Sequence, residues 1–211
     1  ILEQTPNLDW LEIISENYLV EGGKPLYFLD QFKERYPIAM HGVSMNIAST
    51  DPLNLSYLKD LKKLIKRVSP IWVSDHCCWT GVSAHNAHDL LPLPYNEESV
   101  NHISQRIIQI QDTLERPILL ENLSSYLSFK DSTMTEWQFL SEICERSQCY
   151  LLCDINNIYV SARNHNFEPM EYIKGIPKER VLQHHLAGHA DHGEYIIDTH
   201  DSPVVEPVFD L

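Results

Sequence analysis

The sequence has no hydrophobic run long enough to cross a membrane, and no signal-peptide pattern opens it. Basic residues are also scarce, with 16 Lys and Arg against 30 Asp and Glu and a formal net charge of −14. Non-specific attachment to nucleic acid depends on a basic surface, so this balance argues against a nucleic-acid partner. We therefore expect a cytoplasmic protein that binds neither a membrane nor a nucleic acid.

Glycine-rich phosphate loops and paired cysteines are missing as well. Neither G-x-G-x-x-G nor G-x-x-x-x-G-K-[ST] occurs, which disfavours a flat, doubly wound nucleotide-binding sheet. The 5 cysteines are an odd number and include no C-x-x-C pair. Neither a zinc ribbon nor a disulfide framework is indicated, and we expect reduced, mostly buried thiols.

The sequence does contain an alternation of short apolar runs with segments long enough for a helix. This order is typical of a parallel sheet with crossover helices. At 211 residues and 43% hydrophobic content, the chain can bury a sizeable core, and we expect one α/β domain over residues 1–211. The expected strands lie at 11–14, 38–41, 71–75, 118–121, 150–154 and 181–185.

Three helix starts can be predicted. Asp51 before Pro52 predicts a capped start for a leucine-rich helix. Asn96 precedes two glutamates and an isoleucine-rich helix. Thr135 and Gln138 have the spacing of a capping box.

The most informative feature is that successive predicted strands end in residues that can bind a metal. A single residue of this kind at a strand end is readily explained by a structural hydrogen bond. The same pattern at several successive strand ends is not. In a parallel β/α barrel the carboxyl ends of the strands converge on one face, where active sites lie. The sequence therefore predicts a multinuclear metal site built from His41, His76, Glu121, Asp154 and His185.

Further candidates follow the last two of these strands. Asn157 lies three residues after Asp154, so one turn could present both to the same cluster. Strand residues alternate in direction, so if His185 points inward, His184 points outward. His189 is then a candidate for a residue behind the metal or in contact with substrate.

Two more pairs of residues have metal-ligand spacing. Asp198 and His200 would project to the same side of an extended segment. His85 and His88 lie in a polar loop, where simple solvation is the more ordinary explanation.

A series of motifs also carries a family resemblance. They are HGVS at 41–44, SDH at 74–76, LLPLPY at 90–95, LENLSSY at 120–126, DINNIYV at 154–160, NH at 164–165, HLAGH at 185–189 and IDTHD at 197–201. In this order, over nearly the whole chain, they resemble the multinuclear non-heme iron-dependent oxidases, a family that includes the methanobactin-type oxidases.

The resemblance implies a xylose-isomerase-like TIM barrel that holds two or three irons. It also implies an oxidoreductase that activates O2 to modify cysteine or other residues of a ribosomally made precursor peptide, often with a separate partner protein that presents the peptide. Six strands do not close a (β/α)8 barrel, so we expect the first and last strands to be absent from this chain. The family's late carboxylate would follow Leu211, because Glu206 lies too close to Asp198.

The resemblance also implies ligand roles. His41 and His76 would hold one iron, and Glu121 would bridge it to a second, completed by Asp154 and His185. Asp198 and His200, joined by Asn157 or His165, would hold a third. Glu121, Asp154 and His185 would be the catalytic residues.

The donor set alone leaves the metal and the reaction open. Imidazoles and carboxylates without thiolates suit iron, manganese or zinc. A zinc-dependent phosphodiesterase of the endonuclease IV type shares such ligands but should have a basic groove. A sugar isomerase would need an acid–base pair that the sequence does not reveal, and a metal-storing or scaffold protein would need no reaction at all.

Overall fold

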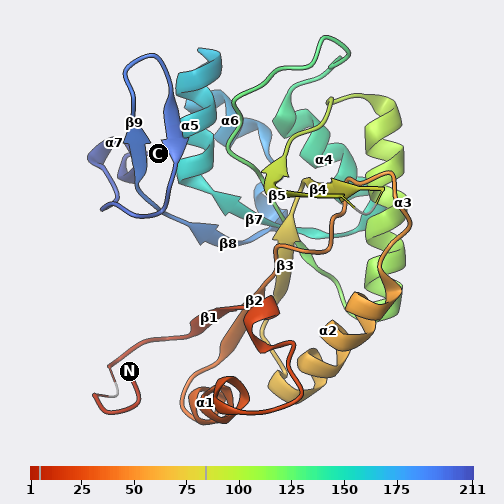
Figure 1. Ribbon diagram of the computed structural model, residues 1–211. Helices are drawn as coiled ribbons and strands as arrows, with labels where there is room; N and C mark the ends of the chain where they lie inside the picture. Colours follow the sequence, from red (N-terminus) through yellow and green to blue (C-terminus); the bar gives the residue numbers. More distant parts are fainter. Residues whose placement is uncertain (5, 84) are drawn as a thin grey trace.

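A curved sheet of six parallel strands forms the centre of the protein (Figure 1). The computed structural model describes residues 1–4, 6–83 and 85–211. Within the sheet, every strand pairs in parallel with its neighbour. In spatial order the strands are β1 (Leu11–Ile14), β2 (Ile38–His41), β3 (Val73–His76), β6 (Leu119–Glu121), β7 (Tyr150–Asp154) and β8 (Val181–His185).

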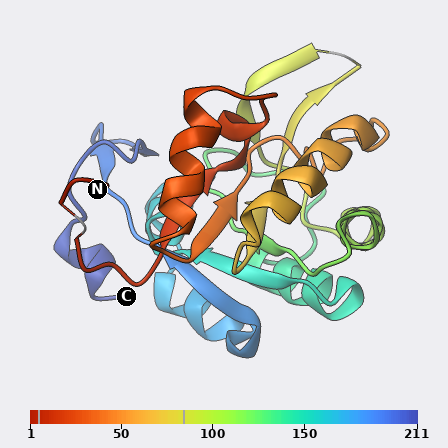
Figure 2. The ribbon, with the colours of Figure 1, turned by 90° about the horizontal axis from the view of Figure 1, so that it is seen from below.

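The helices lie outside the curve of the sheet (Figure 2), and the first four of them pack on one another in chain order. This arrangement confirms the predicted barrel type of α/β fold, here a parallel half-barrel, and excludes the flat doubly wound sheet. The helices are α1 (Lys24–Lys33), α2 (Leu55–Val68), α3 (Glu97–Leu114), α4 (Glu136–Ser147), α5 (Ile155–His165), α6 (Pro169–Gly175) and the short α7 (Glu206–Phe209). Two 3-10 turns, η1 (Ser15–Tyr18) and η2 (Lys178–Arg180), precede α1 and β8.

The apolar core fills the layer between the sheet and the helices. Each fully buried Leu or Ile side chain contributes about 1.5–3 kcal/mol, so this layer supplies most of the stabilisation. The inner face of the sheet is thereby free to carry polar side chains at its carboxyl end. Core residues include Leu58, Leu61, Ile103, Ile107, Ile110, Leu120, Phe139, Leu140 and Ile143.

Two of the predicted helix starts are confirmed, and one is wrong. The Asn96 side chain accepts a hydrogen bond from the backbone N–H of Ser99, and Thr135 forms its capping box with Gln138. The helix expected after Asp51 begins later, at Leu55. Asn54 caps it instead, because the Asp51 carboxylate accepts a hydrogen bond from the backbone of Ser83.

Two antiparallel hairpins lie at the carboxyl ends of the strands. The region around His85 and His88, expected to be a polar loop, instead forms β4 (Trp79–Val82) and β5 (His85–Leu91). A second hairpin, β9 (His189–Asp191) and β10 (Ile196–Asp198), follows β8. Asn164 of α5 holds it by donating to the carbonyl of Ile196 and accepting from its N–H, both at 2.9 Å.

Two further expectations concern the cysteines and membrane-spanning helices. The cysteines are all buried and free of disulfides, as expected. In the described part of the chain, no helix is long and apolar enough to cross a membrane.

Candidate metal centre

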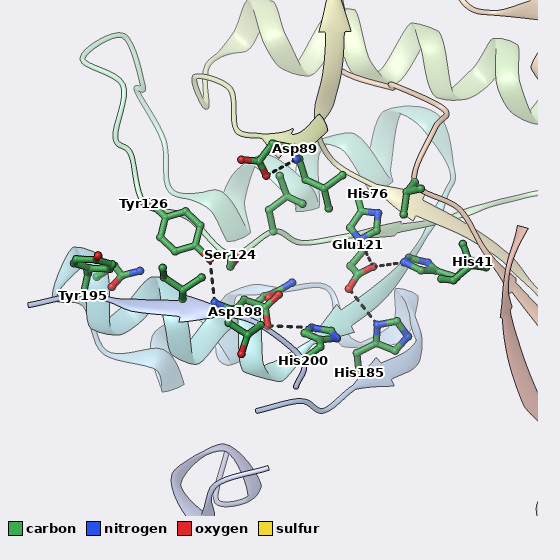
Figure 3. Close-up of a pocket in the computed structure, with 18 of the residues that line it drawn as sticks. His41, His76, Asp89, Glu121, Ser124, Tyr126, His185, Tyr195, Asp198 and His200 are labelled. Atoms are coloured by element: carbon green, nitrogen blue, oxygen red, sulfur yellow. Dashed lines mark hydrogen bonds and ion pairs between the residues drawn. The ribbon is translucent and has the colours of Figure 1, made fainter. Parts of the chain in front are cut away.

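Each of the five strand-end residues is the final residue of its strand, namely of β2, β3, β6, β7 and β8. The parallel register places Glu121 beside His76 and Asp154 beside His185. Four of them line a cavity of about 910 Å³, and Asp154 is fully buried next to it (Figure 3). The predicted convergence of His41, His76, Glu121, Asp154 and His185 is therefore what the structure has.

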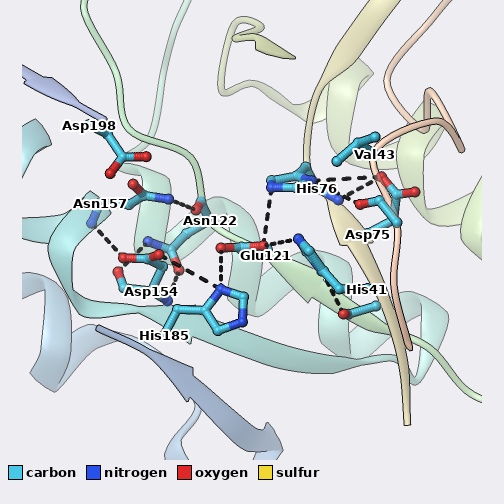
Figure 4. A network of polar contacts seen from close by, with 12 residues as sticks. His41, Val43, Asp75, His76, Glu121, Asn122, Asp154, Asn157, His185 and Asp198 are labelled. Atoms are coloured by element: carbon cyan, nitrogen blue, oxygen red, sulfur yellow. Dashed lines mark hydrogen bonds and ion pairs between the residues drawn. The ribbon is translucent and has the colours of Figure 1, made fainter. Parts of the chain in front are cut away.

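Glu121 lies at the centre of this cluster (Figure 4). Its Oε2 is 3.1 Å from His41 Nε2 and 3.2 Å from His76 Nε2. Its Oε1 is 3.2 Å from His185 Nδ1. These residues form two groups of three possible metal ligands, and within each group the donor atoms lie within 4.8 Å of one another. Glu121 belongs to both groups. Each carboxylate oxygen thus faces a different group, as a bridging ligand requires.

The tautomer of His76 leaves a lone pair facing the Glu121 carboxylate. His76 Nδ1 is 3.1 Å from the carbonyl of Gly42, which can only accept, so Nδ1 carries the hydrogen. Position 42 must be glycine for this approach, because a Cβ there would lie 2.6 Å from the Asp75 carboxylate. Nε2 of His76 then opposes a carboxylate oxygen, an arrangement that a cation between them would stabilise.

His41 has the same arrangement. The Ser74 hydroxyl donates to the carbonyl of Met40 and is 2.8 Å from His41 Nδ1, which therefore donates to it. Burial lowers the pKa of His41 to about 4, despite the nearby Glu121 charge, so the ring is neutral at pH 7. Its Nε2 is a second lone pair directed at Glu121 Oε2.

Buried acceptors without partners support the same interpretation. Glu121 Oε2, Asp154 Oδ2 and Asn157 Oδ1 are buried and receive no hydrogen bond from the described residues. Such atoms are uncommon in folded proteins and need an explanation, such as an ion. Carboxylate, amide and imidazole donors suit iron, manganese or zinc, so the residues present fit a metal centre.

Glu12 completes the cluster, and the sequence analysis missed it. Its Oε1 is 2.8 Å from His185 Nε2, and its other oxygen contacts Gln183 at 2.5 Å, which links the two edge strands β1 and β8. Burial opposes charge on His185, but its contacts with Glu12 and Glu121 raise its pKa to about 10. The available signal was a lone charge inside the apolar run of β1.

Asp154 is held rigidly by its neighbours. Its backbone N–H donates to the Asn122 side chain, which donates back to the Asp154 carbonyl. Its Oδ1 caps α5 by accepting from the N–H of Asn157 at 2.7 Å, so Oδ2 is left for another partner. Burial and the charge of Glu121 raise the pKa of Asp154 to about 7.

A third group adjoins the first two. His200 Nε2 is 3.0 Å from Asp198 Oδ1 and 3.7 Å from Asp154 Oδ2. The segment is not extended as expected: His200 has a φ of 54°, and this turn brings the two side chains together. The Asn156 side chain donates to Asp198 at 2.6 Å and fixes the carboxylate.

Of the other predicted site residues, some lie at the metal cavity and others lie away from it. Asn157 lines the cavity near this third group. His189 lies behind it, 2.9 Å from the Asn156 side chain. His165 contacts the Ser125 hydroxyl at 3.0 Å and lines a separate cavity. His184 points outward and is exposed, as expected. His85 and His88 are exposed too, on the β4–β5 hairpin.

Comparison with known proteins agrees with this geometry. A family model described as "RiPP precursor modification enzyme MbnB/TglH/ChrH" matches residues 1–211. The chain belongs to this family. RiPP denotes a ribosomally synthesised and post-translationally modified peptide, so the MbnB/TglH/ChrH assignment supports a metal-dependent enzyme that modifies peptides, and it confirms the resemblance seen in the sequence.

Relatives of this chain include two bacterial proteins named UPF0276. The Caulobacter vibrioides protein is 56% identical over 208 residues, which are 99% of this chain and 74% of that protein. The protein from Anaeromyxobacter sp. is 48% identical over 206 residues, covering 98% and 73%.

Solved structures share the fold at low sequence identity. A D-tagatose 3-epimerase-like protein superposes with a TM-score of 0.57 at 18% identity, covering 91% of this chain and 71% of that one. D-psicose 3-epimerase gives 0.56 at 8% identity, covering 89% and 68%. These likenesses show that the chain shares its curved parallel α/β fold with these proteins.

Because Glu121 belongs to both groups of ligands, we can predict how many metal ions the variants of these groups bind. Titration of metal-free protein with Zn²⁺ should show that Glu121→Gln loses tight binding at both groups, since one oxygen is replaced by an amide nitrogen. His185→Gln should lose one ion and keep the His41–His76 site. His184→Gln is the matched control and should bind like the wild type. Full zinc binding by Glu121→Gln would show that this residue is structural.

The raised pKa of Asp154 predicts a pH effect on metal-free protein. A carboxyl whose pKa rises from 3.8 to about 7 on folding binds its proton more tightly when folded, so its contribution to stability falls as pH rises through that window. Asp154→Asn should therefore be more stable than the wild type at about pH 8, by on the order of 1–3 kcal/mol, and the gap should narrow at about pH 5.

Urea denaturation with a chelator present measures this difference. Asp60→Asn, on the exposed face of α2, is the control and should change little at either pH. A pH-independent difference for Asp154→Asn would contradict the interpretation.

Proposed function

We propose that this chain is a multinuclear iron-dependent oxidase that uses O2 to modify cysteine or another residue of a ribosomally made precursor peptide. The observation that carries the proposal is the position of Glu121, whose two oxygens face two adjacent groups of ligands. A centre of adjoining metal ions is suited to reactions that move more than one electron. The family membership supplies the peptide as substrate.

The proposed ligands are His41, His76 and Glu121 for one ion, and Glu121, Asp154 and His185 for the next. Asp198 and His200, with Asn157, would hold a third. Bound iron would supply the redox chemistry with O2. Because no cysteine lies among these ligands, iron rather than a thiolate-preferring metal suits the set, and manganese or zinc could still compete for it.

The protein's own residues orient the ligands and hold protons. Ser74 and the Gly42 carbonyl fix the hydrogens of His41 and His76 on Nδ1, so both Nε2 atoms are available. Glu12 accepts from His185 Nε2 and so directs Nδ1 toward Glu121. A ligand histidine held by a carboxylate on its other nitrogen is a common way to fix ring orientation.

The walls of the cavity favour a peptide over a phosphodiester. Among the described residues, its lining includes Glu12, Asp89 and Asp198 but neither Lys nor Arg. A phosphodiesterase or nucleic-acid enzyme would need cationic side chains beside the substrate phosphates. The zinc-dependent phosphodiesterase is therefore the weaker alternative, and the epimerase neighbours share only the fold.

Metal content and turnover test the proposal together. Protein purified without oxygen should contain about two to three metal ions per chain, mostly iron, as the number of converging ligands indicates. With a cysteine-containing precursor peptide, and with its presenting partner protein where one exists, it should consume O2 and change the peptide mass. His184→Gln should keep this activity, whereas Glu121→Gln should lose it.

Stoichiometric zinc, combined with no O2 consumption after iron loading, would overturn the oxidase proposal. Cleavage of a phosphodiester by the zinc form would support the rival instead. The Glu121→Gln protein should still fold, as circular dichroism would show, because the apolar core lies on the other side of the sheet.

A further inference from the structure

The loop between β6 and α4 can be followed in Figure 1. It exposes several large apolar side chains, and Tyr126 among them lines the metal cavity. Tyr126 is 45% exposed, Leu127 62% and Phe129 37%. Single exposed apolar residues are ordinary, but a group of them next to a functional cavity marks an interaction site.

This loop is fixed to the rest of the protein. The N–H groups of Thr133 and Met134 donate to the carbonyl of Tyr95, and the N–H of Tyr95 donates to the Ser132 hydroxyl. At its other end, the N–H of Ser125 donates to the hydroxyl of Ser161 on α5. The apolar side chains are therefore presented by an anchored segment.

Residues of this loop line three cavities. Leu123, Ser124 and Tyr126 line the metal cavity. Leu127 and Phe129 line a neighbouring cavity of about 280 Å³, with Trp137 and Phe167 among its walls. A third cavity, of about 520 Å³, shares Phe129 and Leu93 with the second and reaches Trp79 and Val82 of β4. We call the surface that runs from Tyr126 at the metal cavity, through Leu127 and Phe129, to Trp79 the apolar track.

The residues that line the three cavities include Asp and Glu side chains but neither Lys nor Arg in the described part of the chain. Asp89 lies in the metal cavity, and Glu98 and Asp131 lie in the third. Lys130 is exposed beside Asp131 in the loop but does not line the cavity. The carboxylates that do line the cavities favour a cationic partner. The surface thus combines large apolar side chains with negative charge.

We propose that the apolar track binds the substrate peptide in an extended form and selects one that carries large apolar side chains beside Lys or Arg. An extended strand can place alternate side chains in adjoining pockets while its other side chains meet the acidic rim. The identity of the peptide as substrate rests on the proposed function, whereas the binding preference rests on the track alone.

Fluorescence anisotropy on metal-free protein tests the preference without any redox chemistry. Three fluorescein-labelled peptides without cysteine would be used: one rich in Phe and Lys, one in Phe and Glu, and one in Ser and Lys. The Phe–Lys peptide should bind about tenfold or more tightly than either of the others, because only it matches both the apolar side chains and the charge. Added salt should weaken its binding.

Two leucine variants locate the binding. Leu127→Ser should bind the Phe–Lys peptide about tenfold more weakly than the wild type. Leu55→Ser is the matched control, since Leu55 is 66% exposed and lies at the start of α2, away from the track. It should bind like the wild type, and both variants should keep the circular dichroism spectrum.

Equal affinity for the three peptides, or equal binding by Leu127→Ser and Leu55→Ser, would overturn the proposal. A dimer in light scattering that Leu127→Ser converts to a monomer, with no peptide binding, would assign the track to a second copy of the chain and also overturn it. Iron-loaded protein separates the two proposals: selective binding without O2 consumption refutes the oxidase but leaves the track intact.

Discussion

The structure depends on one buried carboxylate surrounded by imidazoles. Glu121 is almost fully buried, and burial alone would raise its pKa, yet the hydrogen bond from His185 lowers it. The carboxylate is therefore kept charged in a place where an isolated charge would be costly. Cations on both sides are the natural complement of that charge, so the parallel register of the strand ends determines the chemistry.

A second layer of residues makes the arrangement specific. Ser74 and the Gly42 carbonyl decide which nitrogen of each histidine is free, and Asn122 holds the backbone of Asp154 on the neighbouring strand. Glu12 contacts both His185 and Gln183, so it joins the two edge strands at the metal centre. These contacts cross between strands, which is why a change in sheet curvature would disturb the centre before it disturbed the core.

Sequence alone predicted the six parallel strands and the convergence of His, Glu and Asp side chains at the ends of five of them, because burial and chain direction leave a local pattern. It did not predict Glu12, since one charge in a short strand has no local sign of its partner on β8. It placed the start of α2 too early, because the Asp51 carboxylate binds the β4–β5 hairpin instead. It also expected an extended segment at Asp198, although a turn at His200 brings the pair together. Each miss depends on contacts between residues far apart in the chain.

A crystal structure of iron-loaded protein, with anomalous scattering measured at the iron absorption edge, tests the central claim most directly. Our account predicts a peak on each side of the Glu121 carboxylate, one beside Nε2 of His41 and His76 and the other beside Asp154 and His185 Nδ1. A single peak remote from Glu121, or none near either group at full iron loading, would contradict it.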